Sequence, residues 1–218
     1  MSTQKVAVIT GASQGIGAAL VTAYRKLGYA VVANSRSITP SDDPMVRTVA
    51  GDIADPAVAA RVIEQGLSAF GRVDTLINNA GVFVAKPFID YTDEDYDLVT
   101  RVNLRGFFEV SKRAIAAMLT QGGGGHVVNI STSLVDHANS NVPSALASLT
   151  KGGLNAVAPG IIRTPMHPAE THEVLAGLHP IGRMGETSDI VDAITYLETA
   201  AFVTGEILHV DGGQSAGH

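Results

Sequence analysis

The sequence predicts a doubly wound α/β fold, in which a parallel β-sheet is flanked by helices on both faces. Short β-branched runs alternate along the chain with longer segments of helical periodicity, as expected for parallel strands joined by helices. The first of these runs leads directly into a glycine-rich turn and a helical segment. Because 218 residues suffice for one substantial core but not for two, we expect a single domain over residues 1–218.

The individual elements follow from these runs and from capping signals. Asp55 is a favourable N-cap residue, and Pro56 suits the first position of the helix that follows. The expected strands are Val6–Thr10, Ala30–Asn34, Arg47–Ala50, Thr75–Asn78, Val127–Ile130 and Ile207–Val210. The expected helices are Gly15–Leu27, Pro56–Phe70, Asp93–Leu119 and Thr187–Leu197.

Two segments depart from the regular alternation of strands and helices. The helical pattern over Asp93–Leu119 is long, and we expect it to break or bend near Asn103–Gly106. The second and third strands are joined only by Arg36–Val46, which contains proline and has no helical pattern. Since a parallel crossover usually takes about a dozen or more residues, we expect this connection to be a bare loop.

Composition excludes several classes of function. Hydrophobic residues make up 45% of the chain, which is enough for a core, and the net charge of −6 is spread without a basic run. We therefore expect no binding to nucleic acid or to an anionic membrane. The chain has no cysteine, so it forms no disulfide, and we predict no metal site. Neither a signal peptide nor an apolar stretch of roughly 20 residues is present, which favours a cytoplasmic location.

The segment Thr10–Gly17 has the spacing of a Rossmann-type dinucleotide-binding turn. Gly11 permits a sharp strand-to-helix turn, Gly15 lets the backbone approach a pyrophosphate, and Gly17 allows the helix to pack closely on the strand. The helix N-terminus then offers N–H groups to the anion. The same residues also spell the Gly-x-Ser-x-Gly pattern of a hydrolase nucleophile elbow. Such an elbow needs an upstream strand and an oxyanion loop before it, and only ten residues precede Gly11. A turn without a ligand is the remaining alternative.

Further motifs, in the same order along the chain, resemble the short-chain dehydrogenase/reductase family. Asn78–Gly81 follows the fourth expected strand, and Asn103 resembles the family's asparagine in the long helix. Val127–Ser133 resembles the strand that leads to the catalytic hydroxyl, with Thr132 as the best match. Pro159–Pro165 resembles the segment that touches the nicotinamide, and the C-terminal Asp-Gly-Gly is also similar. The resemblance covers nearly the whole chain.

The resemblance implies an NAD(P)-dependent oxidoreductase that acts on a small alcohol/carbonyl substrate and forms a homodimer or homotetramer. Together with the glycine turn, it assigns cofactor binding to Gly11, Ser13, Gln14, Gly15, Ile16, Gly17, Arg36, Asp52, Ile53, Asn79, Ala80, Gly81, Lys151, Pro159, Gly160, Ile162 and Thr164.

The end of the second strand bears on the choice of cofactor. An acidic residue there would accept the ribose 2′-hydroxyl of NAD, but the chain reads Asn34-Ser35-Arg36. The guanidinium of Arg36 offers paired donors to a 2′-phosphate, unless it is simply a solvated loop residue. We therefore predict NADP as the preferred cofactor over NAD.

The resemblance also implies a catalytic set: Asn103, Thr132 at the substrate oxygen and Lys151 at the nicotinamide ribose. The family's Tyr-x-x-x-Lys motif reads Ala147–Lys151 here, so alanine stands where the proton-donating tyrosine is expected. His137, in the adjacent loop, is a candidate acid or an exposed histidine. Ser148-x-x-Lys151 matches a serine–lysine acyl-enzyme pattern, which we interpret as accidental. The alternative function is a catalytically silent dinucleotide-binding protein, acting as a sensor or a partner subunit.

The stretch after Lys151 is short for this family. Lys151 runs almost directly into Asn155–Gly160, where the family continues a helix and then begins another strand. Asn155–Val157 belongs to the helix or to the strand, but not to both. We expect such a chain to be less stable than a relative that keeps the segment. Thr164–Arg183 is expected to form the substrate lid.

Overall fold

The computed structural model describes residues 4–135, 143–151, 156–200, 203 and 207–216. Its strands form one sheet in the order β3-β2-β1-β4-β5-β6-β7. Strands β2 and β3 are added on one side of β1, and β4 to β7 are added on its other side. The strand pairs are parallel, with Val6 opposite Ala30 in β1–β2 and Val157 opposite Leu208 in β6–β7. This confirms the predicted doubly wound α/β class. The strands are β1 Val6–Thr10, β2 Ala30–Ser35, β3 Val46–Ala50, β4 Thr75–Asn78, β5 His126–Ile130, β6 Ala156–Pro159 and β7 Leu208–Val210.

The chain divides into two compact units, of which unit 1 is residues 1–81 and 100–128 and unit 2 is residues 82–99 and 129–218. The α-helices are α1 Gly15–Lys26, α2 Pro56–Phe70, α3 Asp93–Thr100, α4 Phe107–Gln121, α5 Ala145–Lys151, α6 His172–Ala176 and α7 Thr187–Thr199. None of the helices in the described residues is long and apolar enough to cross a membrane.

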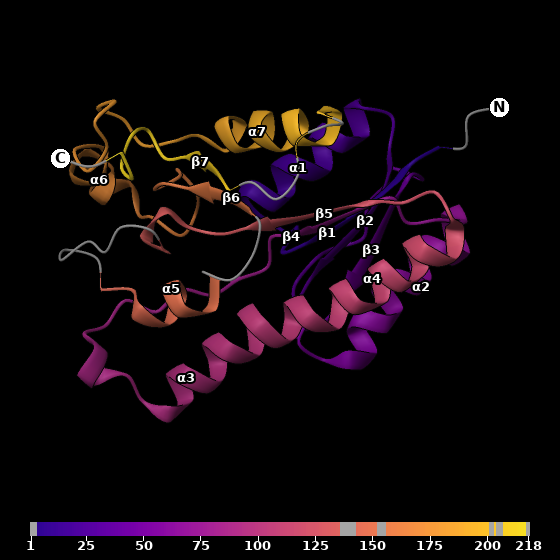
Figure 1. Cartoon of the computed structure of the whole chain (residues 1–218), viewed down its shortest axis with the longest axis horizontal. Helices are drawn as coiled ribbons and strands as arrows, with labels where there is room; N and C mark the ends of the chain where they lie inside the picture. Colours follow the sequence, from indigo (N-terminus) through magenta and orange to yellow (C-terminus); the bar gives the residue numbers. More distant parts are fainter. Residues whose placement is uncertain (1–3, 136–142, 152–155, 201–202, 204–206, 217–218) are drawn as a thin grey trace. The chain divides into compact units, whose positions relative to one another are not determined.

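In unit 1, α1 covers one face of the strands, and α2 and α4 cover the other (Figure 1). Covering both faces explains why β1 consists of fully buried apolar residues from Val6 to Ile9. The core between the strands and the pair α2–α4 contains Val6, Val8, Ala30, Val32, Val49, Ile53, Val58, Ala59, Val62, Ile63, Val73, Leu76, Val110, Ala114 and Met118.

Capping residues explain why the start and end of α2 could be predicted from the sequence. The carboxylate of Asp55 accepts a 2.8 Å hydrogen bond from the N–H of Ala57, and Pro56 occupies the first helical position. The helix ends at Phe70, and the next residue, Gly71, has a φ of +80° and donates its N–H to Leu67 O. The predicted bounds of this helix are confirmed.

The long helical segment contains the predicted irregularity. Residues Arg101–Gly106 form a π-helical stretch between α3 and α4, and Asn103 lies within it. Gly106 is needed here because a Cβ atom at this position would lie 2.9 Å from Ile53 Cγ2. Such π segments recur at functional sites.

In unit 2, α7 packs on β6 and β7. A capping box starts this helix, in which the side chains of Glu186 and Asp189 each accept a hydrogen bond from the other residue's backbone N–H. The bond from Glu186 N to Asp189 Oδ2 is 2.7 Å long. The structure places Ala156 and Val157 in β6, which resolves their alternative assignments in favour of the strand. Asn155, the rest of residues 152–155 and the candidate acid His137 lie outside the described residues.

Other boundaries differ slightly from the sequence-based expectations. Strands β2, β3 and β5 each gain one residue, β7 begins at Leu208, α1 ends at Lys26, and α7 extends to Thr199. Between β2 and β3 the described chain contains only turns and bends, which confirms the predicted bare loop, although Val46 already belongs to β3. The short elements α5, β6 and α6 were not predicted with bounds.

Candidate functional site

The glycine turn in unit 1 leaves no room for side chains. Gly11 and Gly15 have φ values of +65° and +55°, which other L-residues rarely adopt. A Cβ atom at position 11 would lie 2.8 Å from Asn79 Nδ2, and one at position 17 would lie 2.3 Å from Gly11 O. The glycines therefore allow the turn, α1 and the end of β4 to pack against one another.

The N-terminus of α1 is open to an anion. Gln14, at the N-cap, has an extended backbone and makes no side-chain capping bond, and the first turn holds no acidic residue. Ser13 and Gln14 are exposed, while Ile16 is half-buried. An uncapped helix start presents backbone N–H groups and the positive end of the helix dipole, which suits a phosphate.

Asn79 and Ala80 fix the turn from the adjacent strand end. The amide of Asn79 donates to Thr10 O (3.0 Å) and to Gly11 O (3.1 Å). The hydroxyl of Thr10 accepts the N–H groups of Asn79 (3.1 Å) and Ala80 (3.0 Å). Both Nδ2 hydrogens of Asn79 therefore bind protein carbonyls, so its evident role is to position the turn. Direct contact of Asn79, Ala80 or exposed Gly81 with a cofactor stays a prediction.

The ends of β2 and β3 bring together the other predicted nucleotide residues of unit 1. Arg36 is exposed, and Asp52 forms an ion pair with Arg101 and accepts the N–H of Ala54 at 3.0 Å. Burial alone would raise the pKa of the Asp52 carboxyl. The two donors lower the pKa by more than burial raises it, so the net pKa lies below its usual value. The side chain of Ile53 is buried in the core, so only its backbone is left for a ligand.

Lys151, in unit 2, is the last residue of α5 and is attached to the end of β5 at two points. Its ammonium donates to Ile130 O at 3.1 Å, and the hydroxyl of Ser131 donates to Lys151 O at 3.0 Å. The residue as a whole is half-buried, but its amino group lies deep enough that burial lowers the pKa of Lys151 to about 8.

Three consecutive hydroxyls follow β5, and they are used differently. Ser131 is committed to Lys151 O, and Ser133 donates to Gln214 Oε1 at 3.0 Å. Thr132 is half-buried, and its Oγ1 accepts a long 3.4 Å bond from Leu134 N. Within the described part of the chain, Thr132 is therefore the member of the three whose hydroxyl proton is given to no protein atom.

Ala147 is buried in α5, one helical turn before Lys151. The neighbouring Ser148 donates to Leu134 O at 2.9 Å, whereas Lys151 donates to Ile130 O. The two side chains thus have separate partners, which agrees with our interpretation of the serine–lysine pattern as accidental. Asn103, buried in the π-helical stretch, belongs to unit 1 rather than unit 2.

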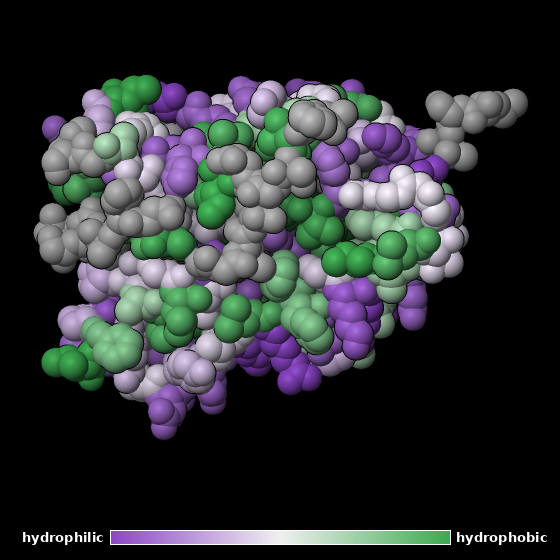
Figure 2. All heavy atoms as spheres, viewed as in Figure 1, coloured by the Kyte–Doolittle hydropathy of each residue, from purple (hydrophilic) through white to green (hydrophobic). Residues whose placement is uncertain are grey.

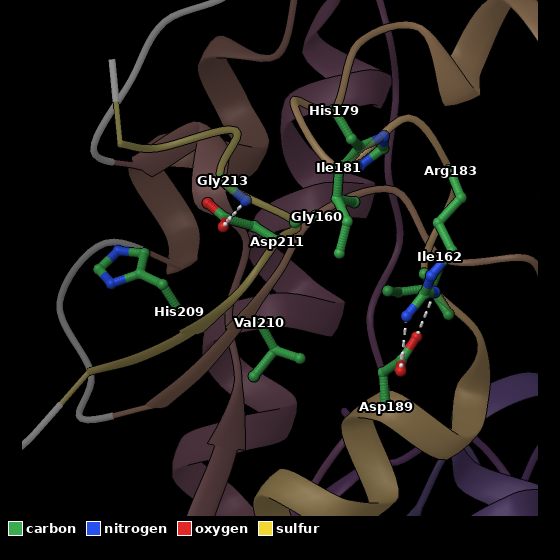
Figure 3. Close-up of a pocket in the computed structure, with 12 residues that line it drawn as sticks. Gly160, Ile162, His179, Ile181, Arg183, Asp189, His209, Val210, Asp211 and Gly213 are labelled. Atoms are coloured by element: carbon green, nitrogen blue, oxygen red, sulfur yellow. Dashed lines mark hydrogen bonds and ion pairs between the residues drawn. The ribbon is translucent and has the colours of Figure 1, made fainter.

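A cavity of about 240 Å³ lies at the carboxyl ends of β6 and β7 in unit 2 (Figure 3). It includes Gly160 and Ile162 of the predicted nicotinamide segment, whereas Pro159, buried at the end of β6, and Thr164 do not line it. One wall is the ion pair Arg183–Asp189, at 2.8 Å. His179 was missed at the sequence level because the predicted lid contains three histidines and no motif distinguishes this one from any other loop histidine. The lining residues are Gly160, Ile162, His179, Ile181, Arg183, Gly185, Asp189, His209, Val210, Asp211, Gly212 and Gly213.

The fold and the glycine turn define a dinucleotide-binding α/β protein. The family model described as enoyl-(acyl carrier protein) reductase matches residues 11–215. L-xylulose reductase of Bos taurus is 34% identical over an aligned stretch of 235 residues, which covers 95% of each protein. The chain belongs to the short-chain dehydrogenase/reductase family. Because that stretch exceeds the 218 residues of this chain, the bovine protein has residues with no counterpart here.

Two solved structures are similar over nearly the whole chain. ElxO with NADP bound has a TM-score of 0.88 and 26% identity, covering 98% of this chain and 100% of that one. The 3-ketoacyl-(acyl-carrier-protein) reductase from Brucella melitensis, complexed with NADH, has a TM-score of 0.87 and 27% identity, with the same coverage. The predicted family and fold are thus confirmed, and the hydrolase alternative loses its basis.

Proposed function

We propose that this protein is an oxidoreductase that prefers NADP over NAD and acts on a small alcohol/carbonyl pair. The observation that carries the proposal is the glycine turn beside an uncapped α1, in a chain that belongs to this family. Among similar proteins, the ElxO structure has NADP bound and the Brucella reductase is complexed with NADH, so both cofactors occur in this fold.

The residues of unit 1 fit the phosphate-bearing half of a dinucleotide. Gly11, Gly15 and Gly17 keep the turn free of Cβ atoms, and the N–H groups at the start of α1 would bind the pyrophosphate. Arg36 is exposed and would pair with a 2′-phosphate. The bound nicotinamide would supply or accept the hydride.

In unit 2, Lys151 would bind the nicotinamide ribose, and Thr132 would donate its hydroxyl hydrogen to the substrate oxygen. The hydrogen-bond pattern supports this division, since Ser131 and Ser133 already donate to protein oxygens. Asn103 of unit 1 would bind a water molecule or a backbone group. These roles come from the family resemblance, together with the contacts around each residue.

Proton transfer is the weak step of this scheme. Reduction of a carbonyl adds a hydride to carbon and a proton to oxygen, and the alanine at position 147 has no proton to give. We infer slow chemistry with intact cofactor binding. The second candidate function, a catalytically silent dinucleotide-binding protein, is favoured by the same residue.

Fluorescence titration with NADPH and with NADH tests the proposal. Saturable binding, tighter for NADPH, is expected, and failure to bind either nucleotide would overturn it. A screen of small alcohols and ketones then separates the two candidates, because a silent protein binds the cofactor without turnover. A coupled assay at high enzyme concentration is needed, since the expected rate is low.

We also propose that the protein is a homodimer or homotetramer. Phe108, Ile115 and Leu119 of α4 are 44–75% exposed, and apolar surface follows part of the course of α4 in Figure 2. Analytical ultracentrifugation tests this, and a monomer at micromolar concentration would contradict it.

A further inference from the structure

The imidazole of His179 is buried and has both nitrogens in use. Its side chain lies in the cavity wall beyond β6 and β7 (Figure 3), and the residue is 4% exposed. The N–H of Ile161 donates to Nε2 at 3.0 Å, and Nδ1 lies 3.1 Å from Leu175 O. Because an amide N–H can only donate, Nε2 must be the acceptor, so Nδ1 carries the proton and donates to Leu175.

This bridge connects two segments that are distant in sequence. Ile161 follows Gly160 after β6, and Leu175 lies in α6 within the predicted lid. The imidazole also packs directly on Gly160, where a Cβ atom would lie 2.9 Å from Nε2. Nearby, Ile181 N donates to Gly212 O at 3.1 Å, so the loop after β7 is attached to the same turn.

Without His179, the N–H of Ile161 would lose the acceptor that it has in the described part of the chain, and an unpaired donor that is partly buried is costly. The loop after β6 would then shift to find another acceptor. His179 is also a poor candidate for the proton donor that position 147 lacks, because its one ring proton is already given to Leu175.

The geometry points to His179 as a positioning residue, which fixes the backbone of Gly160–Ile162 and so shapes the site for the nicotinamide end of the cofactor. This inference rests on the proposed function, because it takes Gly160 and Ile162 as nicotinamide contacts. His179 has no expected role at the adenine end of the cofactor, which the glycine turn and the other residues of unit 1 would bind.

Three variants test the two hydrogen bonds of the His179 imidazole separately. His179→Gln keeps an acceptor for Ile161, His179→Asn keeps a donor for Leu175, and His179→Leu keeps volume but neither bond. His126→Gln is the control, since His126 is a half-buried histidine of β5 that does not line the cavity. Circular dichroism melts confirm that each variant is folded.

The first readout needs no cofactor. Hydrogen exchange at the amides of Ile161 and Ile162 is expected to be at least tenfold faster in His179→Leu and His179→Asn than in the wild type, with His179→Gln in between. Unchanged exchange in His179→Leu would overturn the inference, whatever the protein binds.

The second readout compares NADPH with 2′-phospho-ADP-ribose, which lacks the nicotinamide. His179→Leu is expected to bind NADPH about tenfold more weakly, with reduced nicotinamide fluorescence, and to bind 2′-phospho-ADP-ribose as the wild type does. His179→Gln should recover most of the NADPH affinity. Equal losses for both ligands, or none for either, would reject the positioning role. If the wild type binds neither ligand, the proposed function itself fails.

Discussion

Lys151 Nζ donates a 3.1 Å hydrogen bond to Ile130 O, so the ammonium is bound to the backbone at the end of β5, two residues before Thr132. The bond holds the cation at the strand end that leads to Thr132, whose hydroxyl we assign to the substrate oxygen. A cation there stabilises negative charge that develops on that oxygen. Burial of the ammonium also disfavours its protonated form.

The stability of the protein should therefore depend on pH through Lys151. Burial lowers the pKa of this lysine to about 8 from 10.5, so between these values the unfolded chain binds more protons than the folded one. The free energy of unfolding should rise with pH across that window, by up to roughly 3 kcal/mol, and the cost of the buried charge is fully present below pH 8. Urea unfolding from pH 7 to 10.5 measures it.

In Lys151→Met the rise in unfolding free energy above pH 8 should disappear, whereas Lys26→Met, at an exposed lysine of α1, should keep it. A wild-type profile that is flat relative to Lys151→Met would show that the ammonium is solvated.

A phenol at position 147 tests the prediction that Ala147 stands where the family's proton-donating tyrosine is expected. Ala147→Tyr should raise turnover of a small ketone by ~10²–10⁴, the usual range for a positioned general acid. Because Ala147 is 2% exposed, the larger side chain should also cost about 1–3 kcal/mol of stability through overpacking.

Ala147→Phe is the control for Ala147→Tyr, since it adds the ring without the hydroxyl. It should lose similar stability and gain no turnover. Equal rates for the two variants would mean that the phenol hydroxyl is not at the reacting oxygen.

Several elements could be predicted from the sequence because local signals define them. The fully buried run Val6–Thr10 and the capped helix Pro56–Phe70 have the predicted bounds. The helix Ala145–Lys151 has only seven residues, too few for a periodic pattern. Strand β6, Ala156–Pro159, ends in proline and contains one β-branched residue, so its pattern did not separate strand from helix.

The candidate site also contains some residues that could be predicted from the sequence and others that could not. The glycines of the phosphate turn were predictable because positive φ values and close packing restrict the residue type at positions 11, 15 and 17. The role of His179 was not predictable, because it depends on Ile161 and Leu175, which only the fold brings together. The partners that distinguish Thr132 from Ser131 and Ser133 likewise come from distant residues.

Gly17→Ala should abolish tight cofactor binding. The added Cβ atom would lie 2.3 Å from Gly11 O and 2.7 Å from Asn79 Nδ2, so α1 must move away from the turn. We expect NADPH affinity to fall more than tenfold. Gly28→Ala is the control, since Gly28 has a φ of +85° but open space around it. It should cost about 1 kcal/mol of stability and leave the affinity unchanged. Isothermal titration calorimetry compares the two.

A chain with the family's longer stretch after Lys151 should be more stable than this one. The bovine relative has residues without a counterpart here, and we place the difference between Lys151 and β6. Inserting the relative's residues at that point should raise the melting temperature and reduce aggregation, as judged by calorimetry and light scattering. An unchanged or lower melting temperature would count against this placement.

Arg36 should decide between the two nicotinamide cofactors. Its guanidinium is exposed at the end of β2, and a 2′-phosphate would gain charge-assisted hydrogen bonds there that NADH cannot make. Arg36→Leu should weaken NADPH binding about tenfold and leave NADH within twofold, because each charged contact is worth ~1.5–3 kcal/mol. Arg47→Leu, an exposed arginine of β3, is the control and should alter neither affinity. Raised salt should reduce the preference for NADPH in the wild type but not in Arg36→Leu, since screening acts on the contact that this variant lacks. Equal losses for both nucleotides would instead place Arg36 at a part of the cofactor that NADPH and NADH share.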